Sequence, residues 1–397
     1  MHKIERLLQT LAPKGVEFRK LGEVCEILDN RRIPIAKNKR NPGIYPYYGA
    51  NGIQDYIDSY IFDGDFVLVG EDGSVINKDN TPVVNWASGK IWVNNHAHVL
   101  QTKNELKLKF LYFYLQTIDV SYCVAGTPPK INQENLKKIT IPIPPLEIQQ
   151  EIVKILDAFT ELNTELNTEL KARKKQYEYY QNMLLDFNGI NQNHKDAKMS
   201  AKTYPKRLQT LLQTLAPKGV EFRKLGEVCD FQKGKSITKK AVTFGKVPVI
   251  SGGRQPAYYH NEANRSGETI AISSSGVYAG YVSYWDIPVF LADSFSVSPK
   301  QKTLMPKYLF HYLTTQQDVI HATKSTGGIP HVYSKDLQNF LIPIPPLEIQ
   351  QEIVKILDQF SILTTDLLAG IPAEIKARKK QYEYYREKLL TFKPLKA

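Results

Sequence analysis

The chain has 397 residues, of which 42% are hydrophobic and 23% are charged, so it is long enough for two folded domains and too apolar for a disordered protein. Its formal net charge of +12 favours a polyanionic partner, and the lack of a run of about 18 apolar residues argues against a membrane span. Three cysteines without a metal-binding spacing, and a start unlike a signal peptide, predict a reduced, cytoplasmic protein.

A segment near the start of the chain recurs almost unchanged in the second half. Residues 7–27 read LLQTLAPKGVEFRKLGEVCEI, and residues 211–231 differ from them only in the last two letters. Cys25 and Cys229 occupy matching places, and we expect both to be small buried side chains. A unit of about 200 residues is therefore written twice, and such duplicated units tend to pair around a two-fold axis.

Two stretches of similar length but different sequence, residues 28–141 and 232–342, lie between the repeated segments. Short β-branched and aromatic runs bounded by Gly, Asn and Pro predict strands and turns in both, and one apolar run in each predicts a helix. The corresponding landmarks are 46–52 and 249–256, 65–74 and 268–276, 91–100 and 288–297, 106–117 and 305–315, and 125–132 and 325–333. Each half is therefore predicted to be a mixed α/β domain with one frame and its own loop residues.

The sequence PIPPLEIQQEIVKILD follows each variable stretch directly, at residues 142–157 and again at 343–358. Its paired prolines suit the first turn of a helix, and the acidic residue after them suits the helix N-terminus. Apolar and aromatic positions then alternate in spacings of three and four, which predicts a coiled-coil seam. The seam positions are Leu156, Phe159, Asn163, Leu166, Leu170, Arg173, Tyr177, Tyr180, Leu184 and Phe187 in the first helix, and Leu357, Phe360, Leu367, Ile375, Tyr382, Tyr385, Leu389 and Phe392 in the second.

The second helix has a longer middle segment than the first, and Gly370 and Pro372 in it predict a kink or a break. The basic runs at residues 171–175 and 376–380 are interpreted as a solvated helix face. Contact with a partner subunit or with a nucleic-acid backbone is the alternative for these runs.

The predicted fold class is α/β (α+β): two similar mixed α/β domains separated by two long antiparallel coiled-coil helices, with a pseudo-two-fold internal repeat. The expected boundaries are a first domain at 1–145, a central helix at 146–187, a linker at 188–206, a second domain at 207–346 and a C-terminal helix at 347–397. Met199 in the linker resembles an old start site, so a fusion of two half-length genes is a hypothesis. It requires that the segment after Met199 folds and pairs when expressed alone.

The sequence has no recognisable catalytic constellation: no phosphate-binding loop, dinucleotide fingerprint, serine elbow or amino-methyltransferase motif. His96 and His98 would share one face of a strand, but no third ligand stands out, so neither a metal nor a cofactor is predicted. They are interpreted as ordinary loop or strand residues or as contacts to nucleic acid or a partner. An acidic cluster is interpreted as solvated turns because the second half has no counterpart; it comprises Asp63, Asp65, Glu71 and Asp72.

The helix start IPIPPLEIQQEIVKILD after a G-rich loop, and the segment GVEFRKLGEVC at the start of each domain, resemble the specificity (S) subunit of type I restriction–modification systems. The resemblance covers essentially the whole chain. It implies a non-catalytic subunit whose two target-recognition domains read double-stranded DNA. It also implies two methyltransferase (M) subunits as partners and, in the full complex, restriction (R) subunits.

The residue pattern agrees with this resemblance. Two domains on a rigid helix pair would read two half-sites at a fixed separation. Because the two variable stretches differ, the target should be bipartite and asymmetric. Because the helices and the N-terminal segments are repeated, each half should present the same surface to one copy of the same partner.

Base readout is predicted in the loops where the two halves disagree, because Arg, Asn, Gln and Ser can pair with base edges and Lys with phosphates. The candidates are Lys37, Lys39, Arg40, Tyr47, Tyr48, Asn51, Asn94, Asn95, His96 and Lys130 in the first half, and Arg254, Gln255, Tyr258, Tyr259, Ser273, Ser274, Ser275, Tyr278 and His331 in the second.

Three other interpretations stay open from the sequence alone. A non-catalytic coiled-coil tether or scaffold that holds two protein-binding modules would explain the helices equally well, and gel retardation with random DNA at low salt tests it. An enzyme with an unrecognised site is disfavoured because the variable halves share no equivalent acid, base or nucleophile. A silent specificity gene would have the same sequence features as an active one.

Overall fold

The computed structural model describes residues 2–73, 75–187, 204–300, 302–325, 328–365 and 370–395. The chain forms two compact units, one made of Met1–Asn167 with Glu374–Ala397 and the other of Thr168–Ala373. The first unit therefore contains both the first and the last segment of the chain. Most of the predicted linker, with Met199, and the seam position Leu367 lie outside the described residues. Within the described ranges, no helix is long and apolar enough to cross a membrane.

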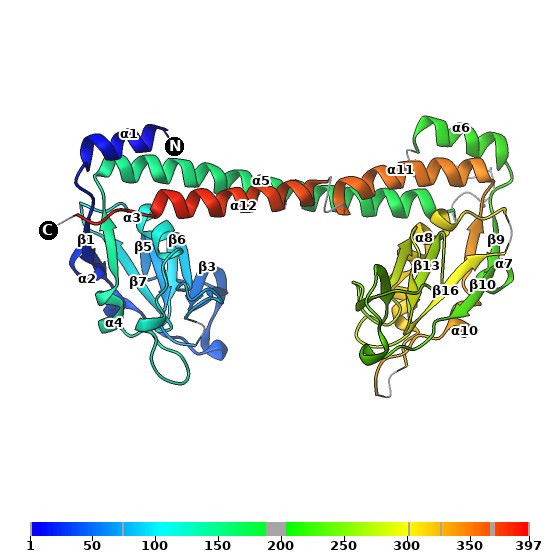
Figure 1. Cartoon of the computed structure of the whole chain (residues 1–397), viewed down its shortest axis with the longest axis horizontal. Coiled ribbons are helices and arrows are strands. Elements are labelled where there is room, and N and C mark those ends of the chain that lie inside the picture. Colours follow the sequence, from blue (N-terminus) through cyan, green and yellow to red (C-terminus); the bar gives the residue numbers. More distant parts are fainter. Residues whose placement is uncertain are drawn as a thin grey trace. The chain divides into compact units, whose positions relative to one another are not determined.

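A six-stranded sheet is the largest sheet of the first unit (Figure 1). Its strand order is β2-β7-β5-β6-β3-β4, and neighbours are antiparallel except β3 and β6, which are parallel. The strands are β2 (Cys25–Ile27), β3 (Pro42–Gly49), β4 (Gly52–Ile57), β5 (Phe62–Gly70), β6 (Val84–Val93) and β7 (Ala97–Thr102). A separate antiparallel pair joins β1 (Glu17–Lys20) to β8 (Thr140–Ile143), just before the long helix.

Helix α3 (Leu108–Leu115) packs against β5 and β6 and buries Phe110, Leu111 and Phe113. Seven of its eight residues are apolar or aromatic, as the sequence LKFLYFYL shows, which suits a helix inside a core. The other helices of the unit are α1 (His2–Leu11), α2 (Leu21–Val24), α4 (Gln133–Lys138), the first part of α5 (Leu146–Leu185) and most of α12 (Ile371–Leu390). Helix α1 lies along α5 on the side away from the sheet (Figure 1), where Lys3 Nζ is 2.5 Å from Glu151.

Helix α5 begins directly after β8 because proline lacks the N–H that would extend the strand and is tolerated in the first turn of a helix. Its residues Ile148, Ile152 and Leu156, each one turn apart, are fully buried in the core of the first unit. The ring of Phe159 stacks on Tyr385 of α12 with centroids 5.6 Å apart. Early residues of α5 thus pack against late residues of α12.

The second unit repeats this plan with smaller sheets, in the orders β10-β16-β13-β14 and β12-β11-β15, and with β9 paired to β17. Its strands are β9 (Glu221–Lys224), β10 (Cys229–Lys233), β11 (Val247–Ile250), β12 (Tyr258–His260), β13 (Thr269–Ser273), β14 (Val282–Trp285), β15 (Phe290–Leu291), β16 (Ser294–Pro299) and β17 (Leu341–Ile344). Its helices are α6 (Lys206–Leu215), α7 (Leu225–Val228), α8 (Pro306–Thr315), α9 (Gln317–Ala322), α10 (Ser334–Leu337), α11 (Leu347–Thr365) and the remainder of α5.

In the second unit, late residues of α5 pack against α11. Tyr180 stacks on Phe360 with ring centroids 5.0 Å apart, and Leu184 and Phe187 are buried in the core. The antiparallel pairing of the two repeated helices is therefore confirmed within each unit.

The second repeated helix is interrupted, as Gly370 and Pro372 predicted. Helix α11 is described as far as Thr365, Gly370 lies in a bend, and α12 begins at Ile371. Pro372 falls in the first turn of α12, where its missing N–H has no helical partner to lose.

The two basic runs behave as solvated helix faces. One predicted seam position is wrong, because the side chain of Arg173 is 44% exposed and pairs with Glu169 on the same helix at 3.5 Å. The lysines of both runs are exposed: Lys171, Lys174, Lys175, Lys376, Lys379 and Lys380.

A buried glutamine fastens the start of each long helix to a distant loop. Gln149 is fully buried; its Oε1 accepts from Lys107 N at 2.7 Å, and its Nε2 donates to Glu105 O at 2.9 Å and Pro144 O at 2.7 Å. Gln350 repeats the three bonds in the second unit with Met305 N at 2.8 Å, Thr303 O at 2.8 Å and Pro345 O at 2.7 Å.

The cysteines at matching places are buried, as predicted. Cys25 is 4% exposed and Cys229 is 1% exposed. Burial raises the pKa of each thiol to about 12, so both are protonated at neutral pH and pack as small apolar side chains.

Candidate nucleic-acid interface

Three loops meet at one end of the large sheet in the first unit: the loop after β5, the loop before β7 and the loop before α4. Glu71 N donates to His96 O at 2.8 Å, and Ile131 N donates to Glu71 O at 2.9 Å. Gly73 N donates to Pro129 O at 3.1 Å, with a φ of +78° at Gly73 that favours glycine. Backbone hydrogen bonds therefore join the three loops to one another.

The second unit has the same three loops with the same bonds. Ser274 N donates to Asp293 O at 2.9 Å, and Val332 N donates to Ser274 O at 3.0 Å. Gly276 N donates to Pro330 O at 3.1 Å, and its φ of +86° places it in the same conformation as the corresponding glycine of the first unit. We call this shared arrangement of three bonded loops the loop frame.

The side chains on the loop frame differ between the units. An isolated β-bridge joins Asp72 to Lys130 in the first unit and Ser275 to His331 in the second. The predicted correspondence of residues 65–74 with 268–276, and of 125–132 with 325–333, is confirmed by these bonds. One backbone arrangement thus carries an acid and a lysine in one unit, and a serine and a histidine in the other.

A fourth loop lies next to the loop frame in both units. It follows β3 in the first unit and β11 in the second, the strands that pair in parallel with β6 and β15. Asn94 N donates to Tyr48 O at 3.0 Å in the first unit, and Ala292 N donates to Ile250 O at 2.8 Å in the second. This loop carries Asn51 in the first unit and Arg254 and Gln255 in the second.

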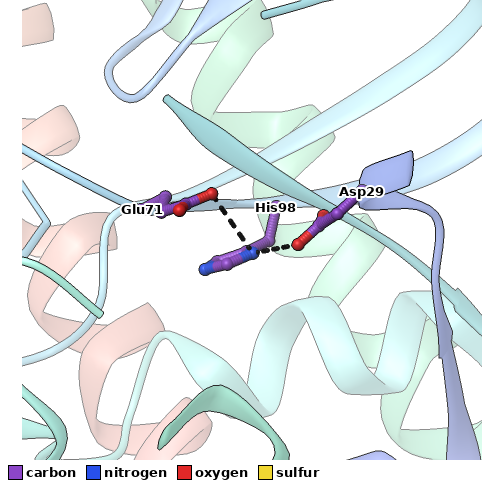
Figure 2. A group of neighbouring side chains, drawn as sticks. All are labelled: Asp29, Glu71 and His98. Carbon is purple, nitrogen blue, oxygen red and sulfur yellow. Dashed lines mark hydrogen bonds and ion pairs between the residues drawn. The ribbon is translucent and has the colours of Figure 1, made fainter. Parts of the chain in front are cut away.

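A buried charge network supports the loop frame of the first unit (Figure 2). His98 of β7 is fully buried; its Nδ1 is 2.6 Å from Asp29 Oδ2 and 3.7 Å from Glu71 Oε2. The other ring nitrogen, Nε2, is 2.7 Å from Ile131 O. Because a neutral imidazole has one N–H, both contacts are hydrogen bonds only in the imidazolium form when the carboxylates are ionised.

The charges of this network decide whether a metal ion fits here. Ligand atoms of Asp29, Glu71 and His98 lie within 4.8 Å of one another. However, Arg32 is 2.5 Å from Glu71 and 3.4 Å from Asp29, and Lys130 is 3.1 Å from Glu71, so two cations already neutralise the carboxylates. Burial alone would raise the pKa of Asp29, but the hydrogen bond and charge of His98 and the charge of Arg32 lower it below its ordinary value. The cluster is a set of ion pairs that positions the loops.

The two histidines differ from the prediction that they share a strand face. Strand β7 begins at Ala97, so His98 belongs to the strand and His96 lies in the turn before it. The side chain of His96 is 47% exposed and pairs with Asp72.

The interpretation of the acidic cluster as solvated turns is also wrong in part. Asp63 and Asp65 are exposed, although they lie in β5 and not in turns. Glu71 is not a solvated residue, because its side chain is 13% exposed and is held by Arg32 and Lys130. Its partners are 39 and 59 positions away in sequence, which explains why the local pattern did not reveal them.

The loops of the second unit hold their side chains by stacking. The guanidinium of Arg254 lies over the rings of Tyr278 and Tyr281, at 5.0 and 5.6 Å from the centroids. Ser251 Oγ donates to Asp293 Oδ2 at 3.0 Å. Arg254 and Tyr278 are both exposed and therefore lie where a base or a phosphate can reach them.

The structure divides the predicted readout residues by exposure. Four have buried side chains and are placed to position loops: Tyr47, Tyr48, Asn94 and Ser273. Five are half-buried: Arg40, Tyr258, Ser274, Ser275 and His331. The exposed residues are Lys37, Lys39, Asn51, Asn95, His96, Lys130, Arg254, Gln255, Tyr259 and Tyr278.

Tyr47 illustrates a positioning residue. Its hydroxyl accepts from Ile35 N at 3.0 Å, and Arg40 stacks over its ring at 4.0 Å. Arg40 Nε also donates to Ile35 O at 3.0 Å. The pair therefore fixes the loop that leads into β3, together with its exposed lysines.

Lys239 and Lys240, which were not among the predicted readout residues, occupy the loop of the second unit that corresponds to the loop before β3. A single 3-10 turn, Lys37–Lys39, precedes β3, and a corresponding turn, Lys239–Ala241, precedes β11. Lys239 and Lys240 are exposed, like the two lysines of the first turn. The run KSITKKA carried the signal, but its letters do not align with IPIAKNK without the structure.

Comparisons with known proteins agree with this duplicated geometry. The family pattern described as a type I restriction modification DNA specificity domain matches residues 13–175 and 217–377. A putative type I restriction enzyme specificity subunit of Haemophilus influenzae is 37% identical over 402 residues, which is 98% of each chain. A type I restriction enzyme specificity subunit of Escherichia coli is 29% identical over 426 residues, covering 99% of this chain and 97% of that protein.

A solved structure shares the fold. The S subunit of a type I restriction–modification system from M. genitalium has a TM-score of 0.65 and 20% sequence identity, covering 94% of this chain and 95% of that chain. The family pattern matches once in each repeat, and the relative from H. influenzae spans both repeats. The chain therefore belongs to the family of type I restriction–modification specificity subunits.

Proposed function

We propose that the chain is the DNA-recognition subunit of a type I restriction–modification complex and that each unit reads one half of a bipartite, asymmetric DNA target. The observation that carries this proposal is the loop frame, which has one backbone arrangement and two sets of side chains. A fixed frame holds side chains at a constant place relative to the duplex, and different side chains then select different bases.

The exposed side chains of the loops suit base readout. In the first unit, Asn51 and Asn95 offer amide donors and acceptors, and Lys130 offers a cation. In the second unit, Arg254 and Gln255 offer paired donors and an amide. Because the bridge residues Asp72 and Lys130 are replaced by Ser275 and His331 in the second unit, the two half-sites should differ.

The proposed role is not enzymatic. The described residues of the two loop frames include no acid, base or nucleophile that is identical at equivalent positions, so the chemistry would belong to partner subunits. Methyltransferase subunits would modify the DNA, restriction subunits would join them in the full complex, and the assembly would act on cytoplasmic DNA. Helix α5, which passes from the first unit into the second, would set the spacing of the half-sites.

The experiment that tests the function is co-expression with the methyltransferase subunit, followed by sequencing of methylated adenines in the host DNA. One bipartite, asymmetric motif is expected. Replacing residues 28–141 by those of another specificity subunit should change one half of the motif and leave the other half intact. A stable complex that methylates no motif would favour the tether or the silent gene, and a motif that changes in both halves would contradict separate readout.

The repeated segments supply matched surfaces for two copies of one partner. Leu146 is 42% exposed at the start of α5 and Leu347 is 41% exposed at the start of α11. Exposed leucines also end the two N-terminal helices, with Leu11 at 42% and Leu215 at 40%. Equal apolar exposure at equivalent places is the pattern expected of a surface that is covered once in each unit.

Aspartate at Leu146 or Leu347 should remove one methyltransferase subunit, because it places an unpaired charge in an apolar contact. Native mass spectrometry should find one bound copy for each single variant and none for the double variant. Aspartate suits the first turn of a helix, so the fold should persist.

Leu341→Asp is the matched control. Leu341 is 55% exposed, but threonine occupies the corresponding place, residue 140, in the first unit. This variant should retain two subunits. Retention of both copies by the Leu146 and Leu347 variants would place the docking surface elsewhere.

A further inference from the structure

Two branched aliphatic side chains are exposed at the tip of the loop frame in the second unit. Val277 is 81% exposed and Ile329 is 67% exposed. They lie on neighbouring loops, because their adjacent residues Gly276 and Pro330 are joined by a backbone hydrogen bond of 3.1 Å. Together they form a small apolar tip, Val277 and Ile329.

The apolar tip is surrounded by groups that suit a nucleic acid. Ser275 and His331 form the bridge immediately next to it. The guanidinium of Arg254 stacks on Tyr278, the neighbour of Val277, at 5.0 Å. The variable stretch around the tip, residues 232–342, contains 12 Lys and Arg against 6 Asp and Glu. A tip in such a basic setting complements DNA better than it complements an apolar protein surface.

Folding does not require the apolar tip. The first unit closes the same loop frame with Pro128 at the position of Ile329, and the residue after its frame glycine is serine, where the second unit has Val277. Two exposed aliphatic side chains on a frame that forms without them contribute little to stability, so they point to a ligand.

We propose that Val277 and Ile329 read the methyl group on C5 of a pyrimidine in the half-site of the second unit. This inference rests on the proposed function. Aliphatic side chains cannot donate or accept hydrogen bonds, and they gain free energy only by leaving water. The thymine C5 methyl, in the major groove, is the apolar group that ordinary base edges present, and a 5-methylcytosine presents the same group.

The test is a double-mutant cycle between protein and DNA. The probe is the mapped target duplex, with thymine or uracil in the half-site that changes when residues 232–342 are exchanged. The assembled complex should bind the uracil duplex about fourfold more weakly than the thymine duplex, the factor expected from burial of one methyl group. For Val277→Ala with Ile329→Ala, that difference should vanish, while affinity for the uracil duplex stays unchanged.

Each other outcome overturns the inference without touching the proposed function. A half-site without thymine that is insensitive to C5 methylation of its cytosines has no group for the tip to read. An affinity that is equal for thymine and uracil in the parent complex removes the methyl contact. A variant that loses affinity equally for both duplexes would assign the tip to wedging between bases. The control places uracil for thymine in the other half-site. Its effect on affinity should be the same for the parent complex and for the alanine variant.

A motif that contains cytosine where thymine is expected separates the two methyl sources. Methylation of that cytosine at C5 should then raise affinity for the parent complex and not for the alanine variant. The absence of any sequence-specific methylation would instead contradict the proposed function itself.

Discussion

His96 and His98 stand two positions apart and have opposite environments. His98 is fully buried among Asp29, Glu71 and Ile131, whereas His96 is exposed and pairs only with Asp72 among the described residues. The contrast separates a side chain that builds the loop frame from one that can reach a ligand.

Replacing His98 by alanine should destabilise the first unit by about 3–5 kcal/mol, because the buried carboxylate of Asp29 loses its principal partner. Urea denaturation followed through the first unit measures the loss. His96→Ala is the control and should cost less than about 1 kcal/mol, since exposed ion pairs contribute little. Equal losses would mean that the buried network does not support the loops.

At this scale the sequence identified residue types better than their roles. Tyr47 and Asn94 stand at places where the sequences of the two halves disagree, which is why they were predicted to touch bases. Their burial depends on tertiary contacts, such as the hydroxyl of Tyr47 with Ile35 N and the backbone N–H of Asn94, which donates to Tyr48 O at 3.0 Å. A sequence pattern shows neither contact.

Among the elements, the starts of α5 and α11 show most directly how the repeat produces structure. Both contain a buried glutamine with three hydrogen bonds to backbone groups, followed by a second glutamine that is exposed. In each QQ pair, therefore, the first glutamine is a buried structural residue and the second faces solvent.

Gln149→Ala should lower the free energy of unfolding of the first unit by about 2–3 kcal/mol, because it leaves the buried N–H of Lys107 without a partner. Gln350→Ala should do the same to the second unit. The neighbouring exposed residues give matched controls, and Gln150→Ala and Gln351→Ala should change stability by less than about 0.5 kcal/mol. Thermal denaturation of the four variants decides whether the buried position matters.

The two lysine-bearing 3-10 turns lead to a prediction about affinity. The pair Lys37→Ala with Lys39→Ala, and separately Lys239→Ala with Lys240→Ala, should each reduce the slope of log K against log salt by about 2. The reason is that phosphate contacts add affinity without selecting sequence. Fluorescence anisotropy over a salt series measures the slope.

Lys14→Ala and Lys218→Ala, in the repeated N-terminal segments, should leave the salt slope unchanged. A changed target motif in the turn variants would contradict their role as phosphate contacts, and an unchanged slope would place these turns away from the DNA.

Elements with strong local signals were predictable. The apolar run at residues 106–117 became α3, and the paired prolines marked the junction between β8 and α5. The order of strands in the six-stranded sheet was not predictable, because β3 and β6 pair in parallel although 34 residues, 50–83, lie between them, and no local rule specifies that partner.

For the molecule as a whole, the repeat predicted two similar halves but not how the chain is divided between them. The first unit takes in the last 24 residues, Glu374–Ala397. Leu389 and Leu390 are 3% and 4% exposed in its core, and Leu395 N donates to Val16 O at 2.9 Å. The sequence could not show this because both helices share the run KARKKQYEYY near their ends, and either could close either half.

Deleting residues 389–397 should therefore destabilise the first unit and spare the second. Loss of two buried leucines costs roughly 4–10 kcal/mol, from about 2–5 kcal/mol for each residue. Hydrogen exchange should accelerate in β5 of the first unit, while β13 of the second unit stays protected. Thr391→Ala, at an exposed position, is the control, and equal loss of protection in both strands would contradict the division into two units.

Closure of the first unit by the end of the chain also has a consequence for biosynthesis. Residues 2–167 are made before the second unit, yet α12, the helix that completes their core, is made after it. At roughly 5–20 residues per second, the intervening stretch of about 200 residues takes on the order of 10 to 40 s. During that interval the nascent first unit exposes its unfinished core, whereas the second unit has every residue it needs once the interval ends. The half that is begun first is thus the half that matures last.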